Sequence, residues 1–277
     1  MTAVALTIAG SDSGGGAGIQ ADLKSFQELD TFGTSALTAV TAQNTLGVYK
    51  VQPIDPDIVI AQIDAVLKDF NIGAIKTGML FSAEIIEAVA DTLSSHPSIP
   101  LIIDPVMIAK GGEDLLQQSA VDTLKKKLIP LATLITPNIP EAEALANMEI
   151  QTETDIELAA KRMIELGADA VVIKGGHRND HFAEDFFLSA AGENFYMRSP
   201  RINTKDTHGT GCTFSAAITA ELAKGSRIQD AVVTAKQFIH AAIDDGLSIG
   251  HGHGPTNHAA YRNRAANRKD VELIGRY

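Results

Sequence analysis

Short apolar runs alternate with longer amphipathic segments along almost the whole chain. Runs of roughly four to eight apolar residues predict buried strands, and apolar residues at helical spacing predict helices. We expect strands at 3–9, 35–41, 74–78, 100–106, 132–136 and 170–174, and helices at 19–29, 56–70, 83–93, 119–128, 155–166, 215–223 and 230–245, with a further helix opening at 137–141.

This alternation predicts the fold class. Strands that alternate with helices of ten or more residues imply right-handed βαβ crossovers and a mostly parallel sheet covered on both faces. We therefore expect a single-domain, three-layer α/β/α sandwich. The segments Phe186–Ala190 and Asn194–Arg198 predict a β-hairpin that adds antiparallel strands at one edge. No internal repeat, low-complexity linker or proline-rich break divides the 277 residues.

The amino-acid composition restricts the kinds of partner that the protein can bind. Lys and Arg number 23 against 34 Asp and Glu, a net charge of −11, which argues against nucleic acid or an anionic membrane as the main partner. Any phosphate site must then be local, built from backbone N–H groups and a few placed cations or metal ions. A single cysteine excludes an intrachain disulfide and fits a reducing cytosol. The apolar run in residues 1–10 has no basic flank and is too short for a signal or membrane helix, so we expect a soluble, cytoplasmic protein.

A polar, glycine-rich stretch at 203–214 runs directly into a predicted helix. Gly209 and Gly211 let its backbone bend sharply and approach a ligand closely. The segment 209–213 then stands at a helix amino end, where N–H groups without intrahelical partners suit a phosphate. We expect this position to lower the pKa of Cys212, the only cysteine. The alternative is a glycine turn that only caps the helix, with Cys212 as a small buried apolar residue.

A second glycine loop, 10–18, follows the first predicted strand but matches neither common nucleotide motif. The Rossmann pattern fails because Ile19 stands where its last glycine should be, and the P-loop fails because Gly16 replaces its lysine. The loop could instead wrap a small molecule, with Asp12 as a polar anchor, or form a tight surface turn. Gln43, at the end of the next strand, could pair with an aminopyrimidine edge or satisfy loop backbone.

Polar residues also follow the later strands, where ligands bind in such sheets. Asp104 and Glu141 are hard oxygen ligands that could hold Mg²⁺ together with substrate phosphates and water. Lys174 could reach a phosphate as a point charge. Alone, Asp104 could cap a turn, Glu141 could complete a first-turn cap with Asn138, and Lys174 could be an ordinary strand end.

Three histidines, His251, His253 and His258, raise the possibility of a zinc site. The alternating His-Gly-His pattern lacks the spacing of known zinc sites, and no thiolate supports it. We expect no zinc here.

The stretch Asp206-Thr-His-Gly-Thr-Gly-Cys212 resembles the D-T-x-G-A-G-D signature of ribokinase-like kinases, with cysteine in place of the catalytic aspartate. With the other matching stretches, the chain from about residue 5 to 258 is similar to the hydroxymethylpyrimidine/phosphomethylpyrimidine kinases of thiamine biosynthesis. Those stretches are Ala9-Gly-Ser-Asp-Ser-Gly14, Gly18-Ile-Gln-Ala-Asp22, Thr38-Ala-Val-Thr-Ala-Gln-Asn-Thr45, Lys76-Thr-Gly-Met79, Asp104-Pro-Val-Met107, Thr136-Pro-Asn138, Glu141 and Ile173-Lys-Gly-Gly176.

The resemblance implies phosphorylation of 4-amino-5-hydroxymethyl-2-methylpyrimidine, and then of its monophosphate, by ATP with Mg²⁺. It also implies a homodimer and a kinase domain at 1–258. Residues 259–277 lie outside the resemblance and form a basic tail, for which we expect a solvated helix or frayed end. The implied site comprises an anion hole and catalytic segment at Gly209, Thr210, Gly211 and Cys212; a substrate pocket of Gln43, Gly10, Asp12, Asp22, Met79 and Val106; nucleotide contacts at Lys174, Thr207 and Asn138; and metal ligands Asp104 and Glu141.

Three alternatives stay open. Pyridoxal kinases share this scaffold, but they use a second lid cysteine where this chain has Ala109, and they tend to lack the Gln-Asn-Thr of 43–45. A thiol enzyme could use Cys212 as nucleophile, although no partner that orients His208 can be identified from the sequence. A non-catalytic nucleotide sensor is the third. For the kinase, we expect the backbone N–H groups of 209–212 to supply most of the stabilisation of the transferred phosphoryl group.

Overall fold

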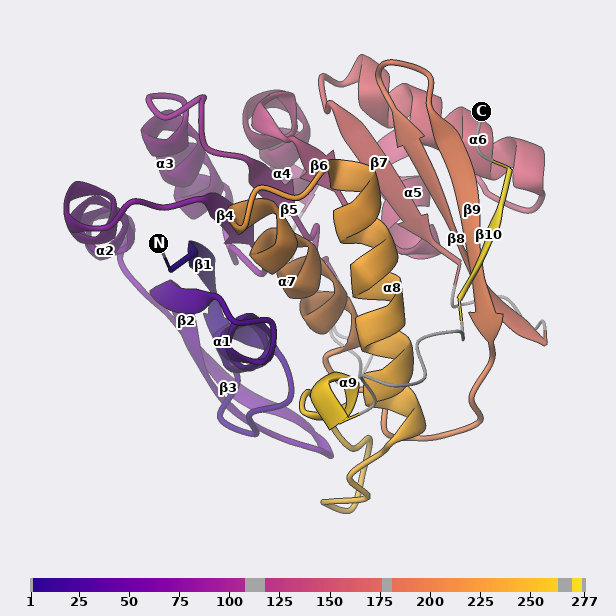
Figure 1. Ribbon diagram of the computed structural model, residues 1–277. Helices are drawn as coiled ribbons and strands as arrows, with labels where there is room; N and C mark the ends of the chain where they lie inside the picture. Colours follow the sequence, from indigo (N-terminus) through magenta and orange to yellow (C-terminus); the bar gives the residue numbers. More distant parts are fainter. Residues whose placement is uncertain (1, 108–117, 176–180, 264–270, 276–277) are drawn as a thin grey trace.

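A central β-sheet organises the computed structural model, which describes residues 2–107, 118–175, 181–263 and 271–275 (Figure 1). Within these residues the sheet has ten strands in the order β10-β9-β8-β7-β6-β5-β4-β1-β2-β3. The strands are β1 (Val4–Ser11), β2 (Phe32–Asn44), β3 (Gly47–Pro53), β4 (Ala74–Thr77), β5 (Leu101–Ile103), β6 (Leu134–Ile135), β7 (Ala170–Lys174), β8 (Phe182–Ser189), β9 (Asn194–Pro200) and β10 (Glu272–Ile274).

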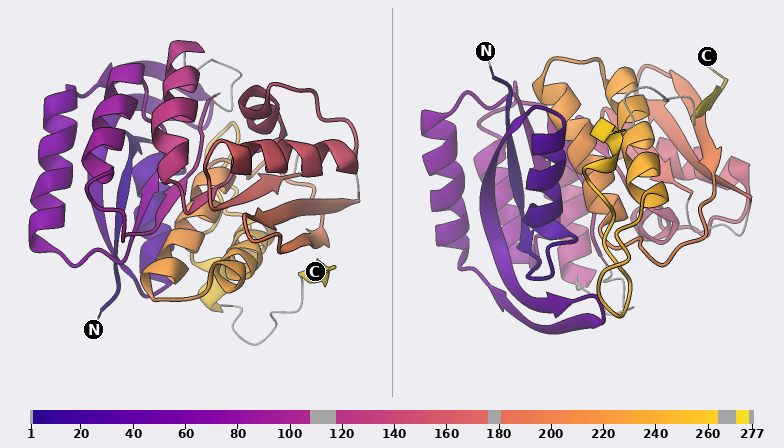
Figure 2. Two further views of the ribbon diagram at one scale, coloured as in Figure 1. Left: turned by 90° about the horizontal axis from the view of Figure 1, so that it is seen from above. Right: turned by 60° about the horizontal axis from the view of Figure 1, so that its bottom comes forward.

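Helices cover both faces of the sheet (Figure 2). One apolar core lies between the sheet and α2 to α6, and a second lies between the sheet and α1, α7, α8 and α9. The three-layer α/β/α fold predicted from the sequence is therefore confirmed. The helices are α1 (Gly18–Glu28), α2 (Pro56–Asp69), α3 (Ala83–Leu93), α4 (Gln118–Thr123), α5 (Ile139–Ala146), α6 (Glu153–Glu165), α7 (Thr210–Ala223), α8 (Ile228–Asp244) and α9 (Ala260–Asn263), with a π-helical turn at Leu124–Leu128 and a 3-10 turn at Ile129–Leu131.

The direction of the strands decides where a ligand can bind. Strands β2, β1, β4, β5, β6 and β7 run parallel, so their carboxyl ends lie at one edge of the sheet. The inner strands β1, β4, β5, β6 and β7 are almost wholly buried, as expected for strands covered on both faces, and β1 has six consecutive buried residues. β2, next to the edge of the sheet, is only partly buried. The predicted hairpin is β8 and β9, which pairs antiparallel with β7. Loops that follow the parallel strands therefore meet at one end of the molecule.

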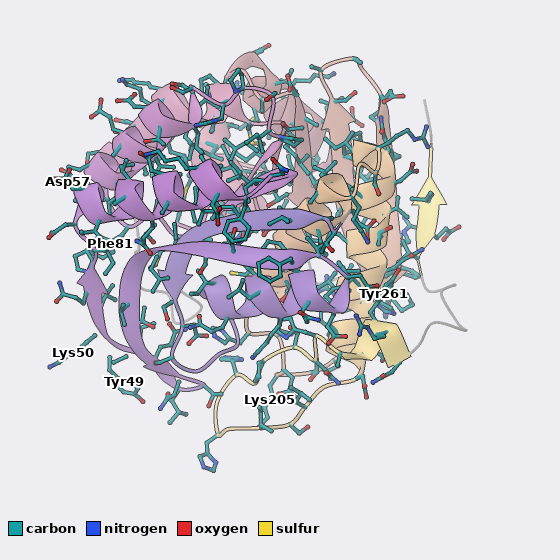
Figure 3. All side chains as sticks on the ribbon, turned by 60° about the vertical axis from the view of Figure 1, so that its left-hand side comes forward. Tyr49, Lys50, Asp57, Phe81, Lys205 and Tyr261 are labelled. Carbon is teal, nitrogen blue, oxygen red and sulfur yellow. The ribbon has the colours of Figure 1, made fainter. Side chains whose placement is uncertain are left out.

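The sequence analysis missed two edge strands. β3 pairs antiparallel with β2, which is 13 residues long rather than the predicted seven. Tyr49 and Lys50 of β3 lie at the periphery of the molecule (Figure 3), and Tyr49 is 63% exposed. β10 pairs antiparallel with β9 at the other edge. Strands that bury little surface give a weak hydrophobic pattern, which explains why both were missed.

The segment after residue 258 is not a wholly solvated tail. Ala260 and Tyr261 are buried, and the Tyr261 ring lies 5.3 Å from that of Phe238 in α8. Arg262 donates to the Gln27 carbonyl at 3.1 Å, at the end of α1. For these residues the expectation of a solvated or frayed end is wrong. The remaining basic residues Arg264, Arg268 and Lys269 lie outside the described residues, as do the lid position Ala109 and the turn at 110–112.

No helix in the described ranges is long and apolar enough to cross a membrane.

Candidate active site

A cavity of about 950 Å³ opens at the carboxyl ends of the parallel strands. Its size lies within the range of small-molecule sites. The structure brings fourteen of the fifteen predicted site residues into its lining. These are Gly10, Asp12, Gln43, Met79, Asp104, Val106, Asn138, Glu141, Lys174, Thr207, Gly209, Thr210, Gly211 and Cys212. Asp22 is the exception and does not line the cavity.

The amino end of α7 forms the floor of the cavity. Gly209 is its N-cap with φ 79°, a left-handed conformation that favours glycine, and a Cβ there would collide with the Gly16 carbonyl. The first bond of the helix joins Thr213 N–H to Gly209 O at 2.9 Å. The N–H groups of Gly211 and Cys212 come before that bond, so they are available to an anion in the cavity. The predicted helix start is confirmed.

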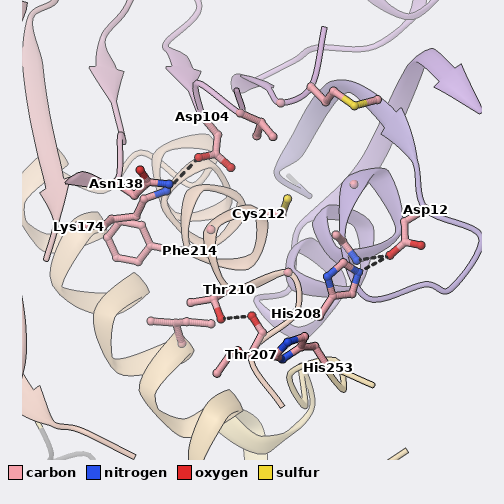
Figure 4. A pocket seen from close by; sticks show the side chains of 18 of the residues that line it. Asp12, Asp104, Asn138, Lys174, Thr207, His208, Thr210, Cys212, Phe214 and His253 are labelled. Atoms are coloured by element: carbon pink, nitrogen blue, oxygen red, sulfur yellow. Dashed lines mark hydrogen bonds and ion pairs between the residues drawn. The ribbon is translucent and has the colours of Figure 1, made fainter. Parts of the chain in front are cut away.

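Cys212 stands between two polar clusters in Figure 4, one around Asp104 and one around Asp12. Burial raises the pKa of its thiol to about 12, although nearby Lys76 and the Gly18 N–H act in the opposite direction. The expectation that the helix end would lower the pKa of Cys212 is therefore wrong, because desolvation of the thiolate outweighs the helix dipole. At neutral pH the thiol is protonated and cannot accept a proton.

The first cluster joins a lysine and a carboxylate from neighbouring parts of the sheet. Lys174, the last residue of β7, lies with its Nζ 3.1 Å from Oδ1 of Asp104, which follows β5. Ser215 donates to the other oxygen of Asp104 at 3.2 Å. Burial opposes both charges, but the pairing raises the pKa of Lys174 and lowers that of Asp104. The cavity therefore holds a cation within reach of the Gly211 backbone: a Cβ on Gly211 would lie 3.2 Å from Lys174 Nζ.

Glu141 has two possible roles in this cluster. It forms a capping box with Asn138 at the start of α5, since Asn138 N–H donates to Glu141 Oε2 at 2.8 Å and Glu141 N–H donates to Asn138 Oδ1 at 2.9 Å. The capping alternative is thus observed, and Glu141 also lines the cavity. Burial raises the pKa of Glu141 to about 7; Asp104 adds to the shift and Lys174 opposes it. A divalent cation would favour the ionised form, so the donor set fits Mg²⁺.

The second cluster gathers around Asp12. Its carboxylate accepts hydrogen bonds from the N–H groups of Gly14, Gly16 and Ala17 at 2.8, 3.0 and 2.8 Å. These bonds shape the loop between β1 and α1. His208 Nε2 lies 2.9 Å from Asp12 Oδ2. The sequence analysis found no partner for His208, and the structure corrects this: its partner is 196 positions away.

Asp22 lies in a buried ion pair. Its carboxylate accepts from Lys76 Nζ at 2.8 and 2.9 Å and from the Thr7 hydroxyl at 2.6 Å, and all three side chains are fully buried. Lys76 itself reaches the cavity lining. Burial lowers the pKa of Lys76, but the Asp22 carboxylate outweighs it and raises the pKa. The sequence analysis missed Lys76 as a site residue, although a lysine inside the apolar strand β4 was a usable signal.

A further part of the cavity lining, not predicted from the sequence, is apolar with one charged pair. Phe214, Ile239 and Ile243 from α7 and α8 line it. Lys236 Nζ lies 2.7 Å from Asp185 Oδ2, and both side chains are buried. A lysine on the buried face of α8 was again the available signal.

The histidines of segment 250–258 have different surroundings in the structure. No group of three or more His, Cys, Asp or Glu side chains in the described part of the chain could hold a metal ion. His258 is buried with its Nε2 3.0 Å from the Thr213 hydroxyl, and His251 is exposed.

A helix amino end, three lysines that each pair with a carboxylate, and the hard carboxylates of Asp104 and Glu141 line one cavity at the carboxyl edge of a mainly parallel sheet. Together, fold and site define a phosphotransferase of the ribokinase-like class. More particularly, the chain belongs to the phosphomethylpyrimidine kinase family, whose family model matches residues 12–257.

The relatives agree with this assignment. Over 259 residues the chain is 60% identical to the hydroxymethylpyrimidine/phosphomethylpyrimidine kinase of Haemophilus influenzae, covering 92% of this chain and 96% of the relative. It is 49% identical over 253 residues to the thiamine biosynthesis bifunctional protein ThiED of Geobacter sulfurreducens, covering 91% of this chain and 51% of that protein. Among solved structures, the pyridoxal kinase of Staphylococcus aureus with AMP-PCP and pyridoxal is 35% identical, with a TM-score of 0.90 and full coverage of both chains.

Proposed function

We propose that this protein transfers the γ-phosphoryl group of ATP to the hydroxymethyl oxygen of 4-amino-5-hydroxymethyl-2-methylpyrimidine, and then a second phosphoryl group to the monophosphate, in thiamine biosynthesis. The single observation that carries this proposal is the cavity itself. It places Gln43, which can pair with an aminopyrimidine edge, in one space with the amino end of α7, which can bind the phosphoryl group.

The substrate would lie against the wall of the cavity formed by Gly10, Gln43, Met79 and Val106. A Cβ on Gly10 would collide with Met79 Cε, so the glycine allows the Met79 side chain to pack directly on the backbone of this wall. Asp12 shapes the loop beside this wall, and Asp22 acts from below through Lys76. This assigns Asp22 an indirect role rather than contact with the substrate.

The phosphates of ATP would lie between α7 and Lys174. Phosphoryl transfer passes through a loose transition state, so the main task of the protein is to position the groups and spread the charge. The N–H groups of Gly211 and Cys212 and the Lys174 ammonium would receive the charge that develops on the transferred group. Thr210, whose hydroxyl donates to Thr207 O at 2.7 Å, holds the loop in shape. Asn138 lines the same side of the cavity.

Asp104 and Glu141 would hold Mg²⁺, together with phosphate oxygens and water. When bound, the ion would neutralise phosphate charge. Two carboxylates suit this ion because Mg²⁺ is usually bound by one or two carboxylates plus substrate phosphates. Cys212 keeps its proton at neutral pH, so we assign it a packing role next to the anion hole and not that of general base. A homodimer and a cytoplasmic location are part of the proposal.

Pyridoxal kinase activity is the second candidate, favoured by the fold similarity to the Staphylococcus aureus pyridoxal kinase. Both substrates are flat heteroaromatic rings with a hydroxymethyl arm. The test is ADP release, coupled to a visible readout, with hydroxymethylpyrimidine and with pyridoxal in parallel. We expect kcat/KM to be at least tenfold higher for the pyrimidine. Equal or higher kcat/KM for pyridoxal would reassign the substrate, and release with neither would remove the kinase function.

A further inference from the structure

His208 links the two glycine loops to Gln43. Its Nε2 lies 2.9 Å from Asp12 Oδ2 and 3.4 Å from the terminal amide of Gln43. The three residues come from the loop before α7, the loop after β1 and the end of β2, and all three line the cavity. Figure 4 shows His208 and Asp12 side by side. In the structure the Gln43 amide is oriented with its nitrogen toward His208 and its oxygen toward Thr41.

The surroundings of Asp12 decide which ring atom of His208 carries a proton. Asp12 Oδ2 already accepts from the N–H groups of Gly16 and Ala17, as an ionised carboxylate does. Burial opposes this ionisation, but the hydrogen bonds from His208 and the backbone hold the pKa of Asp12 below its ordinary value. An oxygen that only accepts requires a donor at 2.9 Å, so His208 Nε2 carries the hydrogen. That single hydrogen points to Asp12, so the Gln43 atom 3.4 Å away receives at most a weak second share of it. An amide oxygen is still favoured there over an amide nitrogen, whose hydrogens would face the Nε2 hydrogen.

The other side of the amide gives the same answer independently. The Thr41 hydroxyl lies 2.8 Å from the Ser11 carbonyl, which can only accept, and 3.2 Å from the Gln43 amide. A hydroxyl has one hydrogen, and Ser11 takes it at the shorter distance. The atom of Gln43 that faces Thr41 must therefore be a donor. Both neighbours favour the amide turned by 180°, with its oxygen toward His208 and its nitrogen toward Thr41.

We infer that His208, held by Asp12, is a positioning residue that fixes the direction of the Gln43 amide and thereby the direction in which the 4-aminopyrimidine ring binds. This inference rests on the proposed function. With one N–H bound to Thr41 and its oxygen facing the His208 Nε2–H group at 3.4 Å, the amide keeps one N–H and one lone pair for a ligand. The amino group and the neighbouring ring nitrogen of the pyrimidine are the complementary donor and acceptor.

The direction matters because it sets where the reacting arm points. If the amide oxygen and nitrogen exchanged places, the ring would have to turn over to keep both hydrogen bonds. The hydroxymethyl group, attached next to the amino-bearing carbon, would then move to the opposite side. Only one amide direction therefore brings the hydroxyl to the amino end of α7. Gly211 and Cys212, in the first turn of that helix, follow His208 by three and four positions.

The His208 ring is well placed for this role because its own position is fixed. Its N–H donates to Gly254 O at 2.9 Å and its carbonyl accepts from Thr256 N–H at 3.3 Å, so the backbone pairs with the segment before His258. A Cβ on Gly16 would lie 2.9 Å from the Pro255 ring and would collide with the His208 ring, so the loop after β1 packs directly on the imidazole. A small movement of the ring would break the Asp12 contact.

The first test measures the proton directly. In the wild-type protein, ¹⁵N-edited NMR of the His208 side chain at pH 7.5 should show Nε2 carrying a hydrogen. A spectrum in which Nε2 is the unprotonated nitrogen overturns the inference. This measurement uses no variant, so it does not depend on whether a variant folds.

The second test compares two ligands by calorimetry. One is hydroxymethylpyrimidine, and the other is its analogue with hydrogen in place of the 4-amino group. For wild type we expect roughly tenfold tighter binding of the amino ligand, as the loss of a buried hydrogen bond implies. In His208→Leu this preference should fall to within about twofold, and His208→Gln, which offers an N–H to Asp12, should restore most of it. His251→Ala, an exposed histidine of the neighbouring segment, is the control and should behave as wild type.

The outcomes separate the inference from the proposed function. A His208→Leu variant that keeps the tenfold preference, or weakens both ligands by the same factor, shows that His208 has only a structural role. A wild-type protein that binds neither ligand and releases no ADP with either would instead remove the proposed function.

Discussion

Lys174 Nζ lies 3.1 Å from Asp104 Oδ1, so the cation that ends β7 neutralises the carboxylate that follows β5. Each group keeps its charge in a buried place because of the other. Incoming phosphates and Mg²⁺ would compete for these two partners: the phosphates would attract the lysine, and the metal would attract the carboxylate. The pair thus neutralises both charges and can separate when both ligands bind.

Replacing Lys174 by methionine should lower kcat/KM for ATP by about 10²–10³-fold, the range found when one stabilising donor is removed from a transition state. The reason is that the developing phosphate charge loses its nearest cation. Steady-state kinetics at saturating hydroxymethylpyrimidine measure the effect. Lys205→Met, an exposed lysine in the same loop region, is the control and should stay within twofold of wild type. A Lys174→Met enzyme with wild-type kinetics would remove Lys174 from the phosphate site.

Asp104→Asn should raise the Mg²⁺ concentration for half-maximal rate by about tenfold, because a neutral amide is a weaker ligand for a hard cation. A Mg²⁺ titration at fixed ATP checks this. Asp57→Asn, on the exposed first turn of α2, should leave the titration unchanged. If the Asp104→Asn curve overlaid the wild-type curve, Asp104 would not be a metal ligand.

Cys212→Ser should lose less than tenfold in kcat, since a thiol with its pKa near 12 is protonated during turnover and cannot act as base. In addition, iodoacetamide at pH 8 should alkylate Cys212 at least about a hundredfold more slowly than free cysteine, because only the thiolate reacts. Rapid alkylation, or a loss of about a thousandfold in kcat, would contradict the packing role and restore Cys212 as a reactive group.

The Lys76–Asp22 pair should behave as one unit. Lys76→Met leaves a buried carboxylate without its cation and should lower the free energy of unfolding by about 3–5 kcal/mol. The double variant Lys76→Met/Asp22→Leu removes both charges and should regain most of this loss. Urea unfolding of both variants and of Asp22→Leu completes a double-mutant cycle, which gives the interaction energy of the pair. Strict additivity of the two single losses would show that the pair does not interact in the folded protein.

His258 should make stability fall in acid. Burial, with a smaller contribution from Lys24, lowers the pKa of His258 from 6.5 to about 4 in the folded protein. The unfolded chain therefore takes up a proton first, so the contribution is present above pH 6.5 and is lost as the pH falls toward 4. Between pH 7 and 4 the wild type should lose about 3 kcal/mol more than His258→Gln. Urea unfolding across this pH range measures the difference, and parallel curves for the two proteins would contradict it.

Much of the fold could be predicted because its interior follows simple patterns. The bounds of α3 and the start of α7 agree with the prediction, since their apolar spacing and their capping residues are local signals. β3 and β10 could not be predicted, because they bury few side chains and are specified by the strands next to them. Tyr261 was expected in a solvated tail, and its burial depends on a contact with Phe238 that no local pattern reveals.

The residues of the candidate site also fall into those that could be predicted from the sequence and those that could not. Residues that end strands, such as Asp104 and Lys174, could be placed at one edge from topology alone. The partner of His208 could not, because Asp12 lies 196 positions away and only the three-dimensional fold brings the two together. The pKa of Cys212 was predicted in the wrong direction because the helix end was visible in the sequence and the burial of the thiol was not.

The most direct test of the central claim is the identity of the product. Purified protein is incubated with ATP, Mg²⁺ and hydroxymethylpyrimidine, and the reaction is followed by ³¹P NMR. We predict a phosphate monoester resonance of the pyrimidine first, then the paired resonances of its diphosphate, with ADP formed in step. ADP and inorganic phosphate without any pyrimidine ester would contradict it.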